Sequence, residues 1–239
     1  MCLYKAVPPQ DFESSHYACT INMQSSSRRI GGCVLSKGVL ALVGNAPMIE
    51  LHNVVPDCGA EVWLKYEVGN PTGSYKDRMA MSVLANAMSR SDVSLGDTVV
   101  EYTGGSAGSS LAFVSAGLGL KFVAVCSGAF SQSKQQTMEA FGAEVIVEKS
   151  YGKGITPELV ERMKDRALDI CDNSNAYYAD QFGSPDVTAG YEPMSQVIIG
   201  ALGRGVDLFC AAVQTAGAHM GAWQGTVKSG SNPRLDETA

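Results

Sequence analysis

From about residue 38 onward, short apolar runs alternate with stretches in which apolar residues recur at helical spacing. The pattern predicts strands at 61–67, 98–102, 121–126, 143–147 and 206–213, after a short apolar run at 48–51. It predicts helices at 75–89, 109–119, 131–141, 157–171, 185–202 and 217–228. Strands separated by helices of this length indicate a parallel sheet with right-handed crossovers, so the predicted fold class is α/β.

The first 37 residues show no sustained period. They contain Pro8-Pro9, three serines at 25–27 and the pair Arg28-Arg29. We predict a flexible N-terminal leader at 1–37. A mitochondrial presequence is an alternative, but Asp11, Glu13 and the lack of an arginine-rich amphipathic face count against it. No secretory signal is visible.

The composition indicates a globular protein that binds neither nucleic acid nor membrane. Hydrophobic residues make up 45% of the 239 residues and charged residues 18%. The net charge of −6 and the pI near 5.1 argue against a nucleic-acid binder, which usually carries a basic face. No apolar run approaches the roughly 20 residues of a membrane span.

The seven cysteines are scattered and include no C-x-x-C pair, and the three histidines are dispersed. This distribution predicts a reduced, cytoplasmic protein without a disulfide framework or a metal site.

Lys76 is the first candidate for chemistry. The run Asn70–Arg78 leads from a Pro/Gly turn into a predicted helix, with Ser74 as its N-cap. At a helix start the N–H groups and the positive end of the dipole disfavour an ammonium and so favour the neutral amine. A lysine that forms an imine with an aldehyde needs this bias. The alternative is a solvated surface lysine after a loop.

Two glycine-rich turns precede helices. Thr103–Ser109 follows a strand, and its N–H groups and hydroxyls suit a carboxylate or phenolate, although a helix simply started by a Gly/Ser turn is the alternative. Gln214–Ala218 opens the last helix and suits a phosphate monoester, although it is also compatible with an ordinary βα turn. Together with the lysine, these turns suggest a phosphorylated aldehyde, which describes pyridoxal 5′-phosphate.

Six segments in order resemble the fold-type-II pyridoxal-phosphate enzymes, the tryptophan-synthase-β-like superfamily, and most closely its cysteine synthase and cystathionine β-synthase branch. The resemblance covers about residue 39 to residue 228. The Lys76 segment resembles N-P-[ST]-x-S-x-K-D-R, and Thr103–Gly108 takes the place of the substrate loop T-S-G-N-T-G. The other segments are Gly44–Leu51, Ala140–Val145, Asp180–Pro185 and Gln214–Ala218.

The resemblance implies roles for individual residues. Lys76 is the implied catalytic and cofactor-binding lysine. The other implied cofactor ligands are Ser106, Thr215, Ala216, Gly217 and Ala218. The implied substrate-binding residues are Thr103, Gly104, Gly105, Ser106, Ala107 and Gln181.

The resemblance also implies the domain organisation. The cofactor-binding fold spans 38–229, with a small domain at about 61–150 and a partial large domain at about 38–60 and 151–229, followed by a short tail at 230–239. Family members usually continue further, so a C-terminal truncation with an uncovered sheet edge is expected.

The chain departs from the family pattern at both turns. Ser106 and Ala107 replace an asparagine and a threonine, and Gln214, Ala216 and Ala218 replace two glycines and a threonine. A substitute for glycine adds strain or bulk where the backbone needs positive φ or close approach.

Two functional hypotheses remain. The first is a homodimeric amino-acid lyase or β-replacement enzyme of cysteine synthase type that acts on serine or O-acetylserine-like substrates. The alternative is a truncated, non-catalytic pseudoenzyme or interaction subunit of the same family. A Rossmann-type nucleotide binder is disfavoured because no G-x-G-x-x-G is followed by an acidic residue after a second strand.

Overall fold

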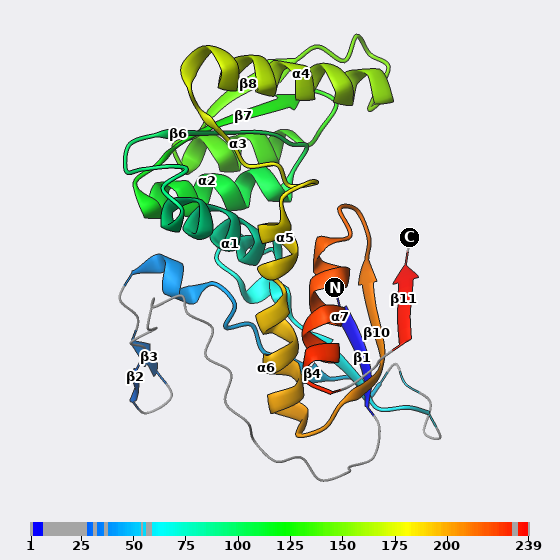
Figure 1. Cartoon of the computed structure of the whole chain (residues 1–239). Coiled ribbons are helices and arrows are strands. Elements are labelled where there is room, and N and C mark those ends of the chain that lie inside the picture. Colours follow the sequence, from blue (N-terminus) through cyan, green and yellow to red (C-terminus); the bar gives the residue numbers. More distant parts are fainter. Residues whose placement is uncertain are drawn as a thin grey trace. The chain divides into compact units, whose positions relative to one another are not determined.

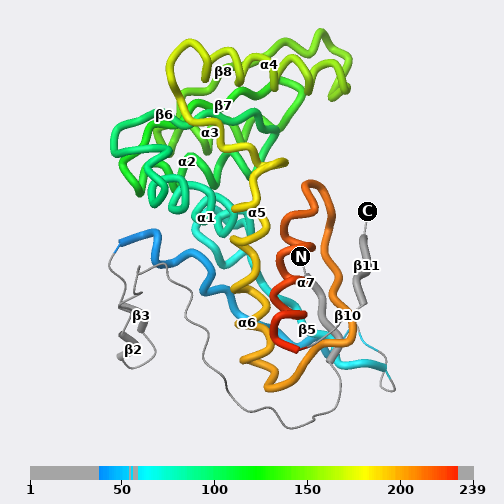
Figure 2. The backbone as a smooth tube through the Cα atoms, in the orientation of Figure 1, coloured from blue at the N-terminus to red at the C-terminus, as the bar shows by residue number. Residues whose placement is uncertain are grey.

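The computed structural model describes residues 2–6, 28–30, 33–35, 38–53, 55, 59–230 and 234–238. The chain forms two compact units, of which one is Met1–Pro71 with Tyr191–Ala239 and the other is Thr72–Gly190. Figure 1 colours the described chain from its N-terminus to its C-terminus, and Figure 2 shows the backbone in the same orientation.

The unit Thr72–Gly190 contains a parallel sheet of four strands in the order β8-β7-β6-β9. Figure 1 shows one helix, α4, on one face of this sheet and α2 and α3 on the other, and α1 packs against α2. The strands are β6 (Thr98–Tyr102), β7 (Lys121–Ser127), β8 (Glu144–Glu148) and β9 (Tyr177–Tyr178). The helices are α1 (Lys76–Ser89), α2 (Ser106–Leu118), α3 (Gln132–Ala140), α4 (Pro157–Ser174) and α5 (Pro185–Ala189). The predicted α/β class with a parallel sheet is confirmed.

Helix α4 shows how local sequence places the core of this unit. The Thr156 side chain accepts a hydrogen bond from the Leu159 N–H, and Pro157 occupies the first turn, where no helical N–H partner is lost. Leu159, Met163 and Ala167 recur at every fourth position, are buried, and therefore face the sheet. They pack against Val100, Val123 and Val125.

The other unit holds a mixed sheet of five strands in the order β11-β10-β1-β5-β4. Strand β1 is antiparallel to β10 and β5, and β11 is parallel to β10. The strands are β1 (Cys2–Ala6), β4 (Met48–Glu50), β5 (Val62–Lys65), β10 (Val206–Ala212) and β11 (Arg234–Thr238). The other elements are the strand pair β2 (Arg28–Ile30) and β3 (Cys33–Leu35), the 3-10 helices η1 (Val39–Leu42) and η2 (Glu67–Gly69), and helices α6 (Glu192–Leu202) and α7 (Gly217–Lys228).

Helices α6 and α7 pack on one another, and α7 packs on β10, as the orange and red segments of Figure 2 show. The core of this unit is formed by side chains from these three elements, among them Met194, Ile198, Phe209 and Ala222. This packing fixes the turn between β10 and α7, which carries the predicted phosphate ligands.

The boundary between the units differs from the predicted one. The chain divides after Pro71 and after Gly190, whereas the sequence predicts divisions after residues 60 and 150. The reason is that α4 packs on β6 and β7, and β9 pairs with β6. Residues 151–190 therefore belong to the unit that contains the parallel sheet.

The predicted helix at 185–202 is wrong as a single element, because it is split into α5 and α6. Pro193 lies in the first turn of α6, where a proline has no N–H to bond to the preceding turn. A Cβ on Gly190 would lie 2.8 Å from the Arg78 carbonyl oxygen, so only glycine permits this approach to α1.

The predicted leader contributes three strands, β1, β2 and β3, while residues 7–27 lie outside the described residues. Among the described residues, no helix has the length and apolar character needed to cross a membrane. Cys126 and Cys171 are free thiols. The described part of the chain holds no cluster of three or more His, Cys, Asp or Glu that suits a metal ion.

Candidate functional site

Lys76 begins α1, and its side chain is only 3% exposed. Burial lowers the pKa of its amine from 10.5 to about 8, and the charge of Glu101 offsets part of this effect. The N-cap residue of α1 is Tyr75 and not Ser74 as predicted, because the helix begins one residue later. The Lys76 N–H still donates to Ser74 Oγ at 3.1 Å, which satisfies one donor of the helix start. A buried amine with this pKa does not fit the alternative of a solvated surface lysine.

The loop before Lys76 is fastened to two helices. The Thr72 N–H donates to Asp77 Oδ2 at 2.9 Å, and the Thr72 hydroxyl donates to Asp77 Oδ1. The same hydroxyl lies 3.2 Å from Ser110 Oγ in α2. Asp77 is fully buried and Thr72 is partly buried, so water competes only weakly for these hydrogen bonds. These bonds hold the backbone on both sides of Lys76 in one conformation.

Asn70 anchors the same sequence motif within the other unit. Its side-chain nitrogen donates to the Glu67 backbone oxygen at 2.7 Å and to Glu67 Oε2 at 2.8 Å. Its side-chain oxygen accepts from the Gly44 N–H at 2.8 Å. Glu67 also forms a buried ion pair with Lys65, with 3.6 Å between Nζ and Oε1. The asparagine therefore has a structural reason to occupy this position.

The predicted substrate loop ends three residues earlier than expected, because α2 begins at Ser106. Ser106 and Ala107 therefore lie in the first turn of a helix, and the first helical bond there is donated by the Ser109 N–H to the Gly105 oxygen. Thr103 Oγ1 accepts from the Gly108 N–H at 3.1 Å and from the Gly105 N–H at 3.4 Å. The N–H groups of Ser106 and Ala107 precede the first helical bond and suit an anion such as a carboxylate.

Gln181 is held against the strand that leads into this loop. Its N–H donates to Glu101 Oε2 at 2.9 Å, and its side-chain nitrogen donates to the Tyr102 carbonyl oxygen at 3.0 Å. The next residue, Phe182, stacks on the Tyr102 ring with 5.5 Å between centroids. The unit Thr72–Gly190 thus contains Lys76, the predicted substrate loop and Gln181. Glu101 links two of these residues, because its carboxyl interacts electrostatically with Lys76 and accepts a hydrogen bond from the Gln181 N–H.

The predicted phosphate turn lies in the other unit, at the start of α7. Ala216 is the N-cap residue and adopts φ of 57°, in the left-handed region that favours glycine. No side chain caps this helix, and its first backbone bond is donated by the Met220 N–H to the Ala216 oxygen at 2.9 Å. The N–H groups of Gly217, Ala218 and His219 precede that bond and have no acceptor within the helix. The N-terminus of α7 therefore suits an anion.

A family model described as pyridoxal-phosphate dependent enzyme matches residues 39–235 of this sequence. The chain belongs to this family. Its fold is tryptophan-synthase-β-like, and the cofactor of the family is pyridoxal phosphate.

Relatives in this family include cysteine synthases. Cysteine synthase B of Escherichia coli is 34% identical over 181 residues, which are 75% of this chain and 57% of that protein. The cysteine synthase of Staphylococcus aureus is 31% identical over 209 residues, which are 84% of this chain and 63% of that protein. The chain thus spans about three fifths of the length of these relatives.

Solved structures agree with this assignment. The crystal structure of O-ureido-L-serine synthase matches 85% of this chain and 63% of its own, with a TM-score of 0.75 and 26% identity. The crystal structure of cysteine synthase from Entamoeba histolytica matches 96% of this chain and 63% of its own, with a TM-score of 0.74 and 25% identity.

The residues present fit the cofactor of the family. A buried lysine with a lowered pKa suits attachment of an aldehyde, and the uncapped first turn of α7 suits a phosphate. The fit is weakest at Ala216, where a non-glycine residue holds the left-handed conformation.

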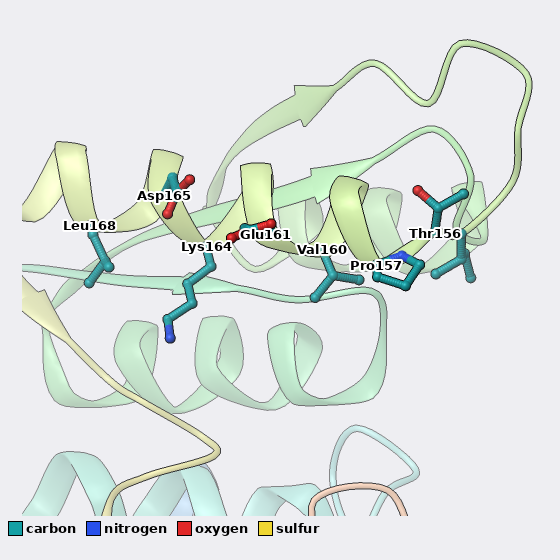
Figure 3. Close-up of a pocket in the computed structure, with 8 residues that line it drawn as sticks. Thr156, Pro157, Val160, Glu161, Lys164, Asp165 and Leu168 are labelled. Atoms are coloured by element: carbon teal, nitrogen blue, oxygen red, sulfur yellow. The ribbon is translucent and has the colours of Figure 1, made fainter.

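A surface pocket of about 670 Å³ lies elsewhere and does not contain any of these residues. Figure 3 shows its lining side chains along α4 and the turn before it. They are Ile155, Thr156, Pro157, Val160, Glu161, Lys164, Asp165 and Leu168. None of them belongs to the motifs of the family, so this pocket is not the candidate site.

Glu101 is the main residue near the site that the sequence prediction missed. It is fully buried in β6, and burial raises the pKa of its carboxyl from 4.5 to about 8. A signal was present, because Glu101 is the one charged residue in the otherwise β-branched and aromatic run Thr98–Tyr102. A charged side chain in such a strand is rarely buried without a partner.

Proposed function

We propose that this chain is a pyridoxal-phosphate-dependent lyase or β-replacement enzyme of cysteine synthase type that acts on serine or O-acetylserine-like amino acids. The observation that carries the proposal is the buried Lys76 amine, whose pKa is lowered to about 8 at the start of α1. The cysteine synthase relatives supply the reaction class.

When bound, pyridoxal phosphate supplies an electron sink for the negative charge that develops at the substrate Cα. Lys76 would hold the aldehyde end of the cofactor, and its Nζ would then take the proton from Cα. With a pKa of about 8 in place of 10.5, roughly a quarter of the amine is neutral at pH 7.5, compared with about a thousandth. The lowered pKa therefore increases the reactive fraction by about two orders of magnitude.

The other residues would bind and orient. The N–H groups of Ser106 and Ala107 would hold the substrate carboxylate, with Thr103 shaping the loop through its two accepted hydrogen bonds. Gln181 would border the same carboxylate. Thr215 and the N–H groups of Ala216, Gly217 and Ala218 would hold the phosphate.

The alternative, a non-catalytic member of the family, is favoured by one observation. Ala216 adopts φ of 57° at the start of α7, and a left-handed residue other than glycine costs about 1–2 kcal/mol. Such strain limits the backbone adjustments by which the turn could fit its N–H groups around a phosphate. The homodimer and the cytoplasmic location remain predictions under either hypothesis.

A titration with pyridoxal phosphate tests the proposal. The wild-type protein is expected to develop the absorbance of a lysine-bound cofactor, Lys76→Ala is expected to lose it, and Lys121→Ala, which changes an exposed lysine of the same unit, is expected to keep it. Turnover with O-acetylserine, serine and threonine then separates the two hypotheses. Cofactor binding without turnover of any of the three would favour the non-catalytic alternative.

A further inference from the structure

The ring of Phe130 covers Gly104 in the predicted substrate loop. A Cβ built on Gly104 would lie 2.2, 2.4 and 2.7 Å from three ring carbons of Phe130. Real Cβ atoms essentially never approach other atoms below 3.0 Å. Gly104 does not have positive φ, so the space taken by the ring, and not the backbone conformation, is what requires glycine here.

The position of the Phe130 ring is fixed by its packing against the hydrophobic core. Phe130 lies in the turn between β7 and α3, where its N–H donates to the Ser127 oxygen at 3.0 Å. Its side chain packs against the hydrophobic core cluster that includes Val123 and Leu159. Moving the ring away from Gly104 would open a gap in this packing.

The ring also changes the chemistry of the loop. The family motif T-S-G-N-T-G has a serine at the position of Gly104, whereas this chain offers an aromatic ring in that space. Gly104, Gly105, Ser106 and Phe130 are all partly exposed, so the ring borders the same surface as the loop. An apolar group beside backbone N–H donors excludes water and strengthens their hydrogen bonds to an anion.

We propose that Phe130 is a positioning residue of the substrate loop. The ring of Phe130 fills the space that a side chain at position 104 would take. The carboxylate of a bound amino acid would then be held by backbone N–H groups, which the ring shields from water, in place of a serine hydroxyl at position 104. This inference rests on the proposed function, because it assumes that the loop Thr103–Ala107 binds the amino-acid carboxylate.

A double-mutant cycle tests the contact without any cofactor. The four proteins are the wild type, Gly104→Ser, Phe130→Ala and the double variant, and the measurement is unfolding in urea. Gly104→Ser is expected to lower the folding equilibrium constant at least tenfold more in the presence of Phe130 than in the Phe130→Ala background. Additive effects of the two changes would show that the ring does not occupy the space of a side chain at 104, and would overturn the inference.

The second measurement separates positioning from a merely structural role. The dissociation constant of L-serine is measured on the same proteins loaded with pyridoxal phosphate, by the change in cofactor absorbance. Phe130→Ala is expected to weaken L-serine binding about tenfold, and Phe130→Leu, which keeps an apolar wall, is expected to recover most of the affinity. Phe141→Ala is the control, since it removes a partly buried ring that packs on Phe113. It is expected to lower stability and to leave the affinity for L-serine unchanged.

The outcomes distinguish this inference from the proposed function. If the wild type takes up the cofactor and Phe130→Ala binds L-serine as tightly as the wild type, the positioning role is overturned and the proposed function stands. If the wild type does not take up pyridoxal phosphate, the proposed function fails and the positioning role fails with it. The unfolding cycle still reports the Gly104 and Phe130 contact in that case.

Discussion

Replacement of the buried carboxyl of Glu101 by the amide of glutamine should remove a pH dependence of stability. Glu101 is 0% exposed, its Oε2 accepts from the Gln181 N–H, and its Oε1 has no hydrogen-bond partner within the described residues. Burial is the main reason why the pKa of this carboxyl rises from 4.5 to about 8, and the charge of Asp180 adds to the effect.

The sign and size of the effect follow from proton linkage. In the unfolded chain Glu101 loses its proton near pH 4.5, whereas in the folded chain it keeps the proton up to about pH 8. The unfolded state therefore binds fewer protons between these values, so the free energy of unfolding falls as the pH rises. At about 1.4 kcal/mol for each pH unit, the loss between pH 4.5 and pH 7 is about 3 kcal/mol.

Urea unfolding of the wild type and Glu101→Gln at several pH values between 5 and 8 measures this effect. The amide oxygen of glutamine can still accept from the Gln181 N–H but does not titrate, so the variant should gain stability over the wild type as the pH rises. Glu144→Gln, which changes an exposed carboxyl in β8, is the control and should follow the wild type. Parallel pH profiles of the wild type and Glu101→Gln would refute the reasoning.

Three further predictions concern the unit that contains α7, and urea unfolding measures each of them. His219 is 3% exposed, and neither of its ring nitrogens has a hydrogen-bond partner within the described residues. His219→Leu should therefore raise the free energy of unfolding by about 1–3 kcal/mol, and a decrease would contradict this prediction. Ala216→Gly should raise stability by about 0.5–1 kcal/mol, because relief of the strain at φ of 57° outweighs the entropy that glycine adds to the unfolded chain. The variant should also bind pyridoxal phosphate more tightly, and equal affinity would argue against a role of Ala216 in the phosphate turn. Asn70→Ala should lose about 2–3 kcal/mol of stability, since it removes two buried hydrogen bonds and one partly buried hydrogen bond. A change below about 0.5 kcal/mol would mean that these bonds contribute little.

The parallel sheet could be predicted because its strands carry a strong local signal. Strand β6 matches its predicted limits, and β7 has six consecutive buried residues, as expected of a strand covered on both faces. The first turn of α4 was marked by Pro157, and α7 matches its predicted limits. In each case the local pattern agrees with the tertiary packing.

Other features depend on contacts between residues far apart in the sequence. The two residues of β9 become a strand only by pairing with Val99 and Val100 of β6, and so no local pattern marks them. The start of α2 was placed too late because Gly108 disfavours helix, yet a Cβ there would lie 2.3 Å from Met138 Sδ. Close packing between α2 and α3 thus overrides local propensity.

The lysine of the candidate site was predictable and its electrostatics were not. The motif around Lys76 is local, and so are Ser74 and Asp77, which fix the backbone of the helix start. Burial lowers the pKa of Lys76, and Glu101, which lies 25 positions further along the chain, offsets part of this effect. Burial of that kind is set by the packing of α1 and α2 and is not encoded in any short segment.

The central claim is that Lys76 is the residue that holds pyridoxal phosphate. The most direct measurement is to incubate the wild-type protein with the cofactor, reduce it with borohydride, and locate the attached group by mass spectrometry of peptides. The account predicts labelling concentrated on Lys76, a reaction that increases as the pH rises through about 8, and no comparable labelling in Lys76→Ala. Labelling spread over exposed lysines such as Lys121, at equal levels in Lys76→Ala, would contradict it.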